Sequence, residues 1–142
     1  MSMNDSTIVR RAENGSPITE IVPGQLYALG GCVPAQRPLS WFPQGFHGWL
    51  PITCYAFREG DHFVLIDTGV AAHKDRIRAG IATLAEGATK REIMVTRREP
   101  DTMINLPWLV SDFGIERVYA GGDLNPLEFF DTIDEASTAA QI

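Results

Sequence analysis

Short stretches in which apolar and polar residues alternate predict that much of the chain forms a sheet. The stretch ITEIVPGQLYALGG, which starts at Ile18, divides into two extended pieces at Pro23-Gly24, a pair of residues typical of a tight turn. The segments ITCYAF and HFVLID are separated only by REGD, so they predict two adjacent antiparallel strands over residues 52–67. The second segment is apolar enough to be a central strand.

After residue 67 the apolar residues follow a helical spacing. Ile77, Ile81 and Leu84 lie on one face of a helix predicted over about residues 72–86, and that face is expected to pack on the sheet.

Two further strands are predicted by the segments REIMVT and IERVYA. Residues 97–105 between them predict a loop, and Pro107 suits the first turn of a second helix, which ends at Gly114. The order strand, helix, strand, helix, strand over residues 61–120 predicts right-handed crossovers and a partly parallel sheet. The expected fold class is therefore α/β or α+β, a mixed sheet with helices packed on one face.

One compact domain is predicted, over residues 18–125, between two less regular ends. Residues 1–17 have little periodic hydrophobicity and predict a flexible N-terminal arm, while 126–142 predict a C-terminal tail with a short helix. Residues 33–51 combine prolines with large aromatic side chains and predict a structured loop. Such a loop either forms one wall of a pocket or covers the sheet, and we favour the covering role.

Composition excludes few functional classes, since 44% hydrophobic and 21% charged residues in a chain of 142 are typical of globular proteins. No apolar run approaches the roughly 20 residues that cross a bilayer, and the first residues are too polar for a signal peptide. We therefore expect a cytoplasmic protein without membrane contact. The net charge of −6 argues against nucleic acid as a partner. Cys32 and Cys54 lack the spacing of a zinc site and are expected to be buried thiols.

The segment ITCYAFREGDHFVLIDTG, the helix after it, the strand IMVT and the stretch TRREPDTMINLPWLVSDFGIERVYAG together resemble the N-terminal half of the metallo-β-lactamase fold. The match covers about residues 18–122. In that superfamily one strand ends in Asp-Thr-Gly, and a later strand ends in Thr-His-x-His-x-Asp-His. Here the first motif begins at Asp67 and the second at Thr96. The resemblance implies a metallo-β-lactamase-like half sandwich.

The second motif has lost its histidines in this chain. Arg97, Glu99 and Thr102 occupy the three histidine positions, Asp101 is unchanged, and Ile104 and Asn105 stand where the family has glycines. The family's hydrolysis depends on imidazole nitrogens that hold zinc and activate a water molecule. A guanidinium stays protonated and offers only hydrogen-bond donors, so it repels a cation. The resemblance therefore implies a degenerate metal site without that chemistry.

Two readings of the carboxylates in this motif remain open. A branch of the superfamily with two irons uses glutamate at this place, which makes Glu99 and Asp101 candidate metal ligands. The favoured reading is that Glu99 pairs with Arg97 or Arg98 and that Asp101 caps the following turn. In the family the Asp-Thr-Gly aspartate supports the metal loop from below, so Asp67 is assigned structural support of residues 97–102, which we call the motif loop.

The three histidines of the chain do not replace the missing ligands. His62 is predicted in a turn and His73 near a helix start, both common places for surface histidines, and His47 lies in the aromatic loop.

Because the family's second half supplies half of the sandwich, the resemblance implies an uncovered sheet face. We therefore expect a non-catalytic, hydrolase-like but truncated domain that forms a homo-oligomer or docks on a protein partner. The aromatic loop and the tail near Phe129 and Phe130 are expected to contribute. No cofactor is expected.

Two alternatives come from other functional classes. The first is a metal-dependent hydrolase of ester, lactone or thioester substrates that binds zinc, iron or manganese through unusual ligands or is completed by another chain. The second is a module that binds a small anionic ligand through Arg97 and Arg98.

Overall fold

The computed structural model describes residues 18–35, 45 and 47–121. The predicted N-terminal arm, the predicted C-terminal tail and most of the aromatic loop lie outside the described residues. Among the described helices, none is long and apolar enough to cross a bilayer.

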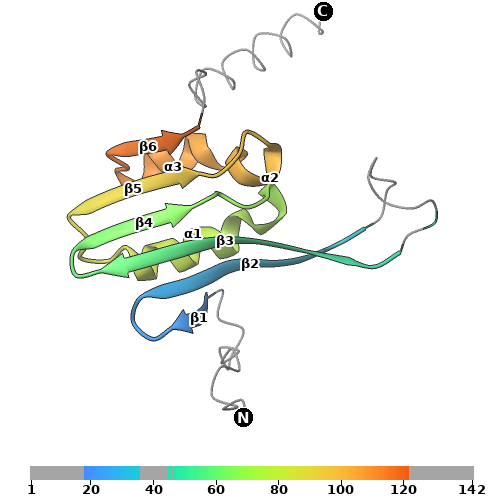
Figure 1. Ribbon diagram of the computed structural model, residues 1–142, viewed down its shortest axis with the longest axis horizontal. Helices are drawn as coiled ribbons and strands as arrows, with labels where there is room; N and C mark the ends of the chain where they lie inside the picture. Colours follow the sequence, from blue (N-terminus) through green and yellow to red (C-terminus); the bar gives the residue numbers. More distant parts are fainter. Residues whose placement is uncertain (1–17, 36–44, 46, 122–142) are drawn as a thin grey trace, which may run out of the picture.

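The described strands form one mixed sheet in which the spatial order of the strands follows their order in the chain (Figure 1). Its strands are β1 (Ile18–Val22), β2 (Leu26–Pro34), β3 (Trp49–Glu59), β4 (His62–Ile66), β5 (Lys90–Val95) and β6 (Arg117–Ala120). Strands β1 to β4 are antiparallel, and β4, β5 and β6 are parallel. The predicted fold class, the hairpin at Pro23-Gly24 and the β3–β4 hairpin are confirmed.

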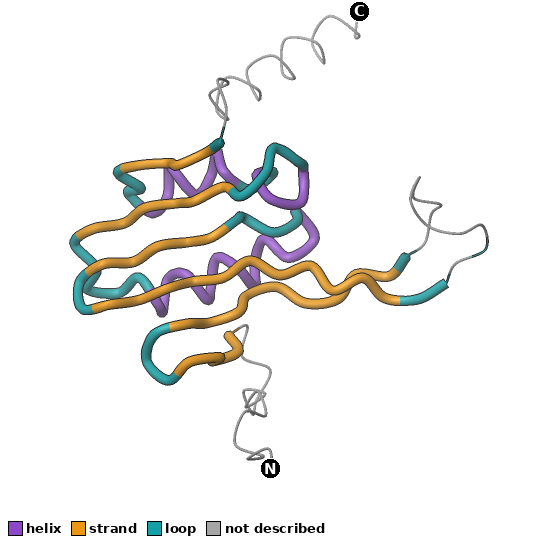
Figure 2. The backbone as a smooth tube through the Cα atoms, viewed as in Figure 1, coloured by secondary structure: helices purple, strands orange, loops and turns teal. Residues whose placement is uncertain are grey.

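The helices lie on one face of the sheet (Figure 2). They are the short 3-10 helix η2 (Ala71–His73), α1 (Lys74–Leu84), α2 (Pro100–Met103) and α3 (Leu106–Phe113). Alternate residues of the strands, such as Phe63 and Leu65 in β4 and Ile93 in β5, are buried against Ile77 and Ile81 of α1. Apolar residues at every second position of the strands therefore pack against apolar residues spaced by about 3.6 along α1, and together they form one core.

Helix boundaries agree with the sequence pattern except in the motif loop. Together η2 and α1 account for the helix predicted over residues 72–86, and Gly114 ends α3 in the left-handed conformation with φ 58°. The loop predicted over residues 97–105 is wrong because it contains α2. Pro100 begins that helix, and reciprocal capping between Glu99 and Thr102 fixes its first turn.

The strands β2 and β3 run beyond their neighbours as a two-stranded ribbon, visible where they project past the end of β4 (Figure 1). Residues 30–34 pair with 49–53 after pairing with β1 and β4 has ended. The loop predicted over residues 33–51 is therefore too long at both ends. At the base of the ribbon only glycine suits position 30, because φ is 120° and a Cβ would lie 2.5 Å from the Ile52 carbonyl oxygen.

The two cysteines differ, contrary to the prediction that both are buried. Cys32 is exposed on the ribbon, whereas Cys54 is buried in the core. Burial raises the pKa of the Cys54 thiol to about 12, so this thiol stays protonated at neutral pH.

Candidate functional site

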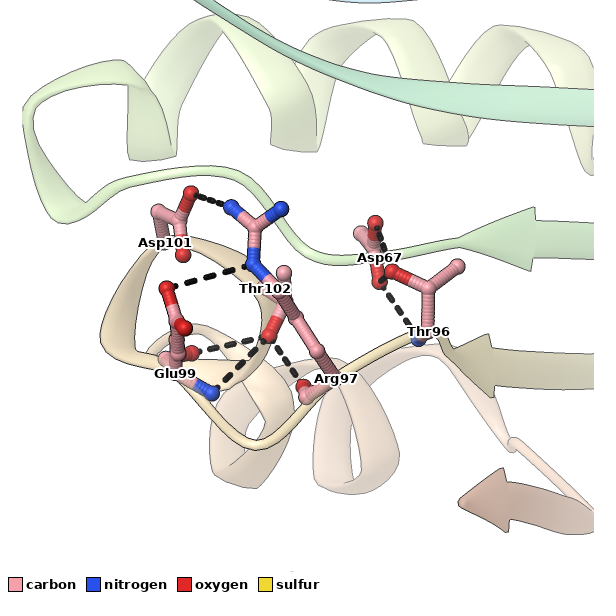
Figure 3. Close-up of polar contacts among 6 residues, drawn as sticks. All are labelled: Asp67, Thr96, Arg97, Glu99, Asp101 and Thr102. Atoms are coloured by element: carbon pink, nitrogen blue, oxygen red, sulfur yellow. Dashed lines mark hydrogen bonds and ion pairs between the residues drawn. The ribbon is translucent and has the colours of Figure 1, made fainter. Parts of the chain in front are cut away.

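The motif loop begins where the parallel strands β4 and β5 end, at one edge of the sheet. Asp67 follows β4 with φ 60°, a left-handed conformation that is uncommon outside glycine. Its carboxylate accepts a hydrogen bond from the Thr96 amide at 2.7 Å and contacts the Thr96 hydroxyl at 2.8 and 3.0 Å (Figure 3). Asp67 thereby ties Thr96, the residue before the motif loop, to the end of the neighbouring strand β4.

Arg97 lies beside the two candidate metal ligands (Figure 3). Its Nε is 3.2 Å from Glu99 Oε2, and its guanidinium donates a hydrogen bond to Asp101. The negative charge of Asp101, more than that of Glu99, raises the pKa of Arg97 above its ordinary value. The predicted pairing of Glu99 with Arg97 is confirmed. The prediction for Asp101 is wrong, because Glu99 is the N-cap of α2 and Asp101 pairs with Arg97.

The neighbouring positions of the motif form local hydrogen bonds. The buried Thr102 hydroxyl lies 2.8 Å from the Glu99 carbonyl oxygen and also contacts the Arg97 carbonyl oxygen. Arg98 donates from Nε to the Gly121 carbonyl oxygen at 3.0 Å. An anion at the predicted Arg97 and Arg98 site would therefore compete with groups of the chain itself. Arg97 already pairs with two carboxylates, and Arg98 with the Gly121 carbonyl oxygen.

A buried contact behind the loop was missed by sequence reasoning. Asn105 donates from Nδ2 to the Thr68 carbonyl oxygen at 2.9 Å and accepts from Trp108 Nε1 at 2.9 Å. The backbone amide nitrogen of Asn105 is 3.2 Å from Thr68 Oγ1. The only sequence signal was that an asparagine replaces a glycine of the resembling family. The side chain locks the Asp67-Thr68-Gly69 turn onto the start of α3.

These residues do not fit a bound transition metal. The loop offers Glu99 and Asp101, and one guanidinium contacts both of them. The histidines lie elsewhere, with His62 in β4 and His73 in η2. Within the described residues no group of three or more histidine, cysteine, aspartate or glutamate side chains could hold a metal ion.

Metal analysis checks this reading. Protein purified without chelators is expected to contain no stoichiometric zinc, iron or manganese by mass spectrometry, because Arg97 places a fixed positive charge between the carboxylates. Arg97→Ala frees both carboxylates and serves as the comparison. Stoichiometric metal in the unmodified protein that disappears in Glu99→Ala would contradict the expectation and favour the hydrolase alternative.

Comparison with known proteins does not assign a family: no protein-family model matches the sequence, and a search of curated proteins finds no match. No activity is therefore transferred from a relative.

The sheet face opposite the helices is a second candidate site. Tyr55, Ile66, Met94 and Tyr119 align across β3, β4, β5 and β6 and point to the same face. Tyr55, Met94 and Tyr119 are 40%, 46% and 45% exposed. This apolar row, which we call the open face, has no helix over it in the described part of the chain.

Glu92, on the same face, is surrounded by groups that stabilise its negative charge. It lies 2.8 Å from His62 Nε2, 3.1 Å from the Tyr119 hydroxyl, 3.6 Å from Lys90 Nζ and 4.0 Å from an Arg117 nitrogen. Burial alone would raise its pKa, but the bonds from His62 and Tyr119 and the charge of Lys90 outweigh burial and lower the pKa below its ordinary value. The network joins three parallel strands. His62 is therefore a partner in a sheet, not the surface turn residue predicted.

Proposed function

We propose that this chain is a non-catalytic, metallo-β-lactamase-like domain that associates with a second copy of itself through the open face. The observation that carries the proposal is the row Tyr55, Ile66, Met94 and Tyr119, in which Tyr55, Met94 and Tyr119 are exposed and Ile66 is half-buried, on strands whose other face is packed against helices.

Parallel strands support the proposal because they are usually covered on both faces. In β4 the helix-facing residues Phe63 and Leu65 alternate with Val64 and Ile66, so both faces of this strand are apolar. Single exposed apolar residues are ordinary, but a contiguous row marks an interaction surface. A face with this composition gains stability when a second apolar layer excludes water from it.

A second copy suits the open face better than a strongly charged partner. The row itself is uncharged. The charge of Glu92 beside it is matched by Lys90 and Arg117 of the same chain, and His62 bonds to the same carboxylate. Two such sheets can pack face to face about 10 Å apart. The resemblance favours the same arrangement, since the complete fold of that superfamily packs two similar halves together.

Metal-dependent hydrolysis is the less favoured function. Arg97 occupies the first histidine position of the motif and is paired with both nearby carboxylates. Nothing in the motif loop then provides an open coordination position for activating water.

Sedimentation equilibrium over a range of concentrations tests the proposal. The unmodified chain is expected to behave as a dimer, and Met94→Glu is expected to weaken the dimer by roughly 100-fold or more, because it buries an unpaired charge in the interface. Ile104→Glu is the matched control: Ile104 is 38% exposed, similar to Met94, but lies after α2 on the helix side. This variant is expected to dimerise normally.

A monomer at all concentrations would exclude self-association. Equal weakening by Ile104→Glu would place the contact outside the open face.

A further inference from the structure

We infer that the projecting β2–β3 ribbon is an arm that packs against the second copy and forms a further part of the association surface. The inference rests on the proposed function, since it adds residues to the same interface. Its first support is the small size of the open face. Tyr55, Met94 and Tyr119 are 40–46% exposed. Large aromatic side chains bury roughly 150–250 Å² when fully covered, so these three offer on the order of 300 Å². A stable interface buries about 800 Å² on each partner, so further surface has to take part.

The ribbon carries no charge on either strand. Neither residues 30–34 nor residues 49–53 contain an acidic or basic side chain. Proteins usually place charged residues on projecting strands, because uncharged strands associate with other chains. Pro34 and Pro51 have no backbone N–H, so the edges of the ribbon are poorly suited to pairing with another strand. The ribbon therefore presents its side chains, not its edges, to a partner.

The helix side of the ribbon is occupied within the chain itself. At the base, a Cβ on Gly31 would lie 3.7 Å from His73 Nε2 and 3.4 Å from an Arg76 guanidinium nitrogen. His73 is only 6% exposed, contrary to the surface position predicted from the sequence. Farther along, Val33 and Leu50 on this side are half-buried. The side left for a partner is the opposite one.

That opposite side continues the open face along β3. Because side chains alternate along a strand, Trp49 and Pro51 lie on the same side of β3 as Tyr55. They pair with Pro34 and Cys32 of β2, and all four residues of the ribbon are exposed. Trp49 is 67% exposed, the highest value for a large hydrophobic side chain among the described residues. The twist of a two-stranded ribbon turns this side progressively out of the plane of the sheet, so the ribbon forms an arm instead of a flat extension.

A second copy is the partner that this side of the ribbon fits. Trp49 and Tyr55 belong to one strand, so a molecule that covers the open face lies next to the ribbon. A symmetric dimer brings the same surface of both chains together, and each interface therefore gains two ribbons. Trp49 alone adds on the order of 150 Å² per chain. Tryptophan is also among the residues that contribute most to binding energy in interfaces.

Sedimentation equilibrium of Trp49→Ser tests the arm. The substitution is expected to weaken the dimer by about 10-fold or more, since it removes the largest exposed apolar side chain of the interface. Ile104→Ser makes a similar change from apolar to polar on the helix side, and this control is expected to dimerise as the unmodified chain does. Circular dichroism of both variants checks that the fold is retained.

Cys32 provides a second measurement, made on the unmodified chain. It is exposed on the same side of the ribbon as Trp49, whereas Cys54 is buried, so a water-soluble aromatic disulfide reagent reacts with Cys32 alone in the folded protein. The reaction is expected to slow several-fold as the protein concentration rises through the dissociation constant of the dimer, because the second copy covers Cys32. In Met94→Glu the rate is expected to be independent of concentration.

The outcomes distinguish this inference from the proposed function. A dimer that Met94→Glu disrupts but Trp49→Ser leaves intact overturns the arm and retains the open face. A dimer that Trp49→Ser alone disrupts supports the arm and contradicts the open face. A Cys32 reaction rate that stays constant while the dimer forms also overturns the arm, and a monomer at all concentrations overturns both proposals.

Discussion

Replacing Asn105 with alanine is expected to lower the free energy of unfolding by about 2–4 kcal/mol. The amide of Asn105 joins the Thr68 carbonyl oxygen to Trp108 Nε1, at 2.9 Å on each side. Alanine removes both bonds and leaves the Thr68 carbonyl oxygen without its donor in a region where Thr68 and Asn105 are both buried. Urea unfolding monitored by circular dichroism measures the change.

Ser111→Ala is the control for this substitution, because Ser111 also bonds within α3 but is exposed. It is expected to change stability by less than about 0.5 kcal/mol. A similarly small effect of Asn105→Ala would show that the turn at Thr68 is held by other contacts.

Glu92→Gln is expected to lower the melting temperature at neutral pH by several degrees. The substitution keeps the shape of the side chain but removes the negative charge that faces His62, Lys90 and Arg117. Because the pKa of Glu92 is lowered in the folded chain, its stabilising contribution is fully present above the pKa that this carboxyl has in the unfolded chain. It is lost as the pH falls through the lower folded-state value.

The difference between the two proteins is therefore expected to shrink and vanish under acid conditions. Melting curves recorded from neutral pH down to about pH 3 follow this change. Glu86→Gln, at an exposed position after α1, controls for the loss of one carboxylate and is expected to melt normally. A pH-independent difference for Glu92→Gln would indicate a packing effect in place of a charge effect.

Local patterns were sufficient to predict most of the sheet and both long helices. The β3–β4 hairpin follows from the two apolar segments on either side of REGD, and α1 from the spacing of Ile77, Ile81 and Leu84. Gly114 ends α3 as expected, because glycine adopts the left-handed conformation without strain. These features depend on residues that are close together in the sequence.

Features that depend on distant partners were not predictable from one sequence. The burial of His73 results from its position beneath the β2–β3 ribbon, whose extent is set by pairing between residues 30–34 and 49–53. The role of Asn105 requires Thr68, which lies 37 residues earlier in the chain. The pairing of Arg97 with Glu99 is local and was predicted, whereas the cap at Glu99 was assigned to the wrong carboxylate.

The strand order described above also bears on how the protein is made. Because each described strand pairs with the strand that precedes it, its partner has already left the ribosome when it emerges. The sheet can therefore form by adding one strand at a time, because no described strand pairs with a strand far away in the sequence. Folds with such short-range pairing form quickly, since little loop entropy is lost at each step. Newly made chains would then expose unpaired strand edges only briefly, and the open face would be an apolar surface that stays accessible until the self-association that we propose covers it.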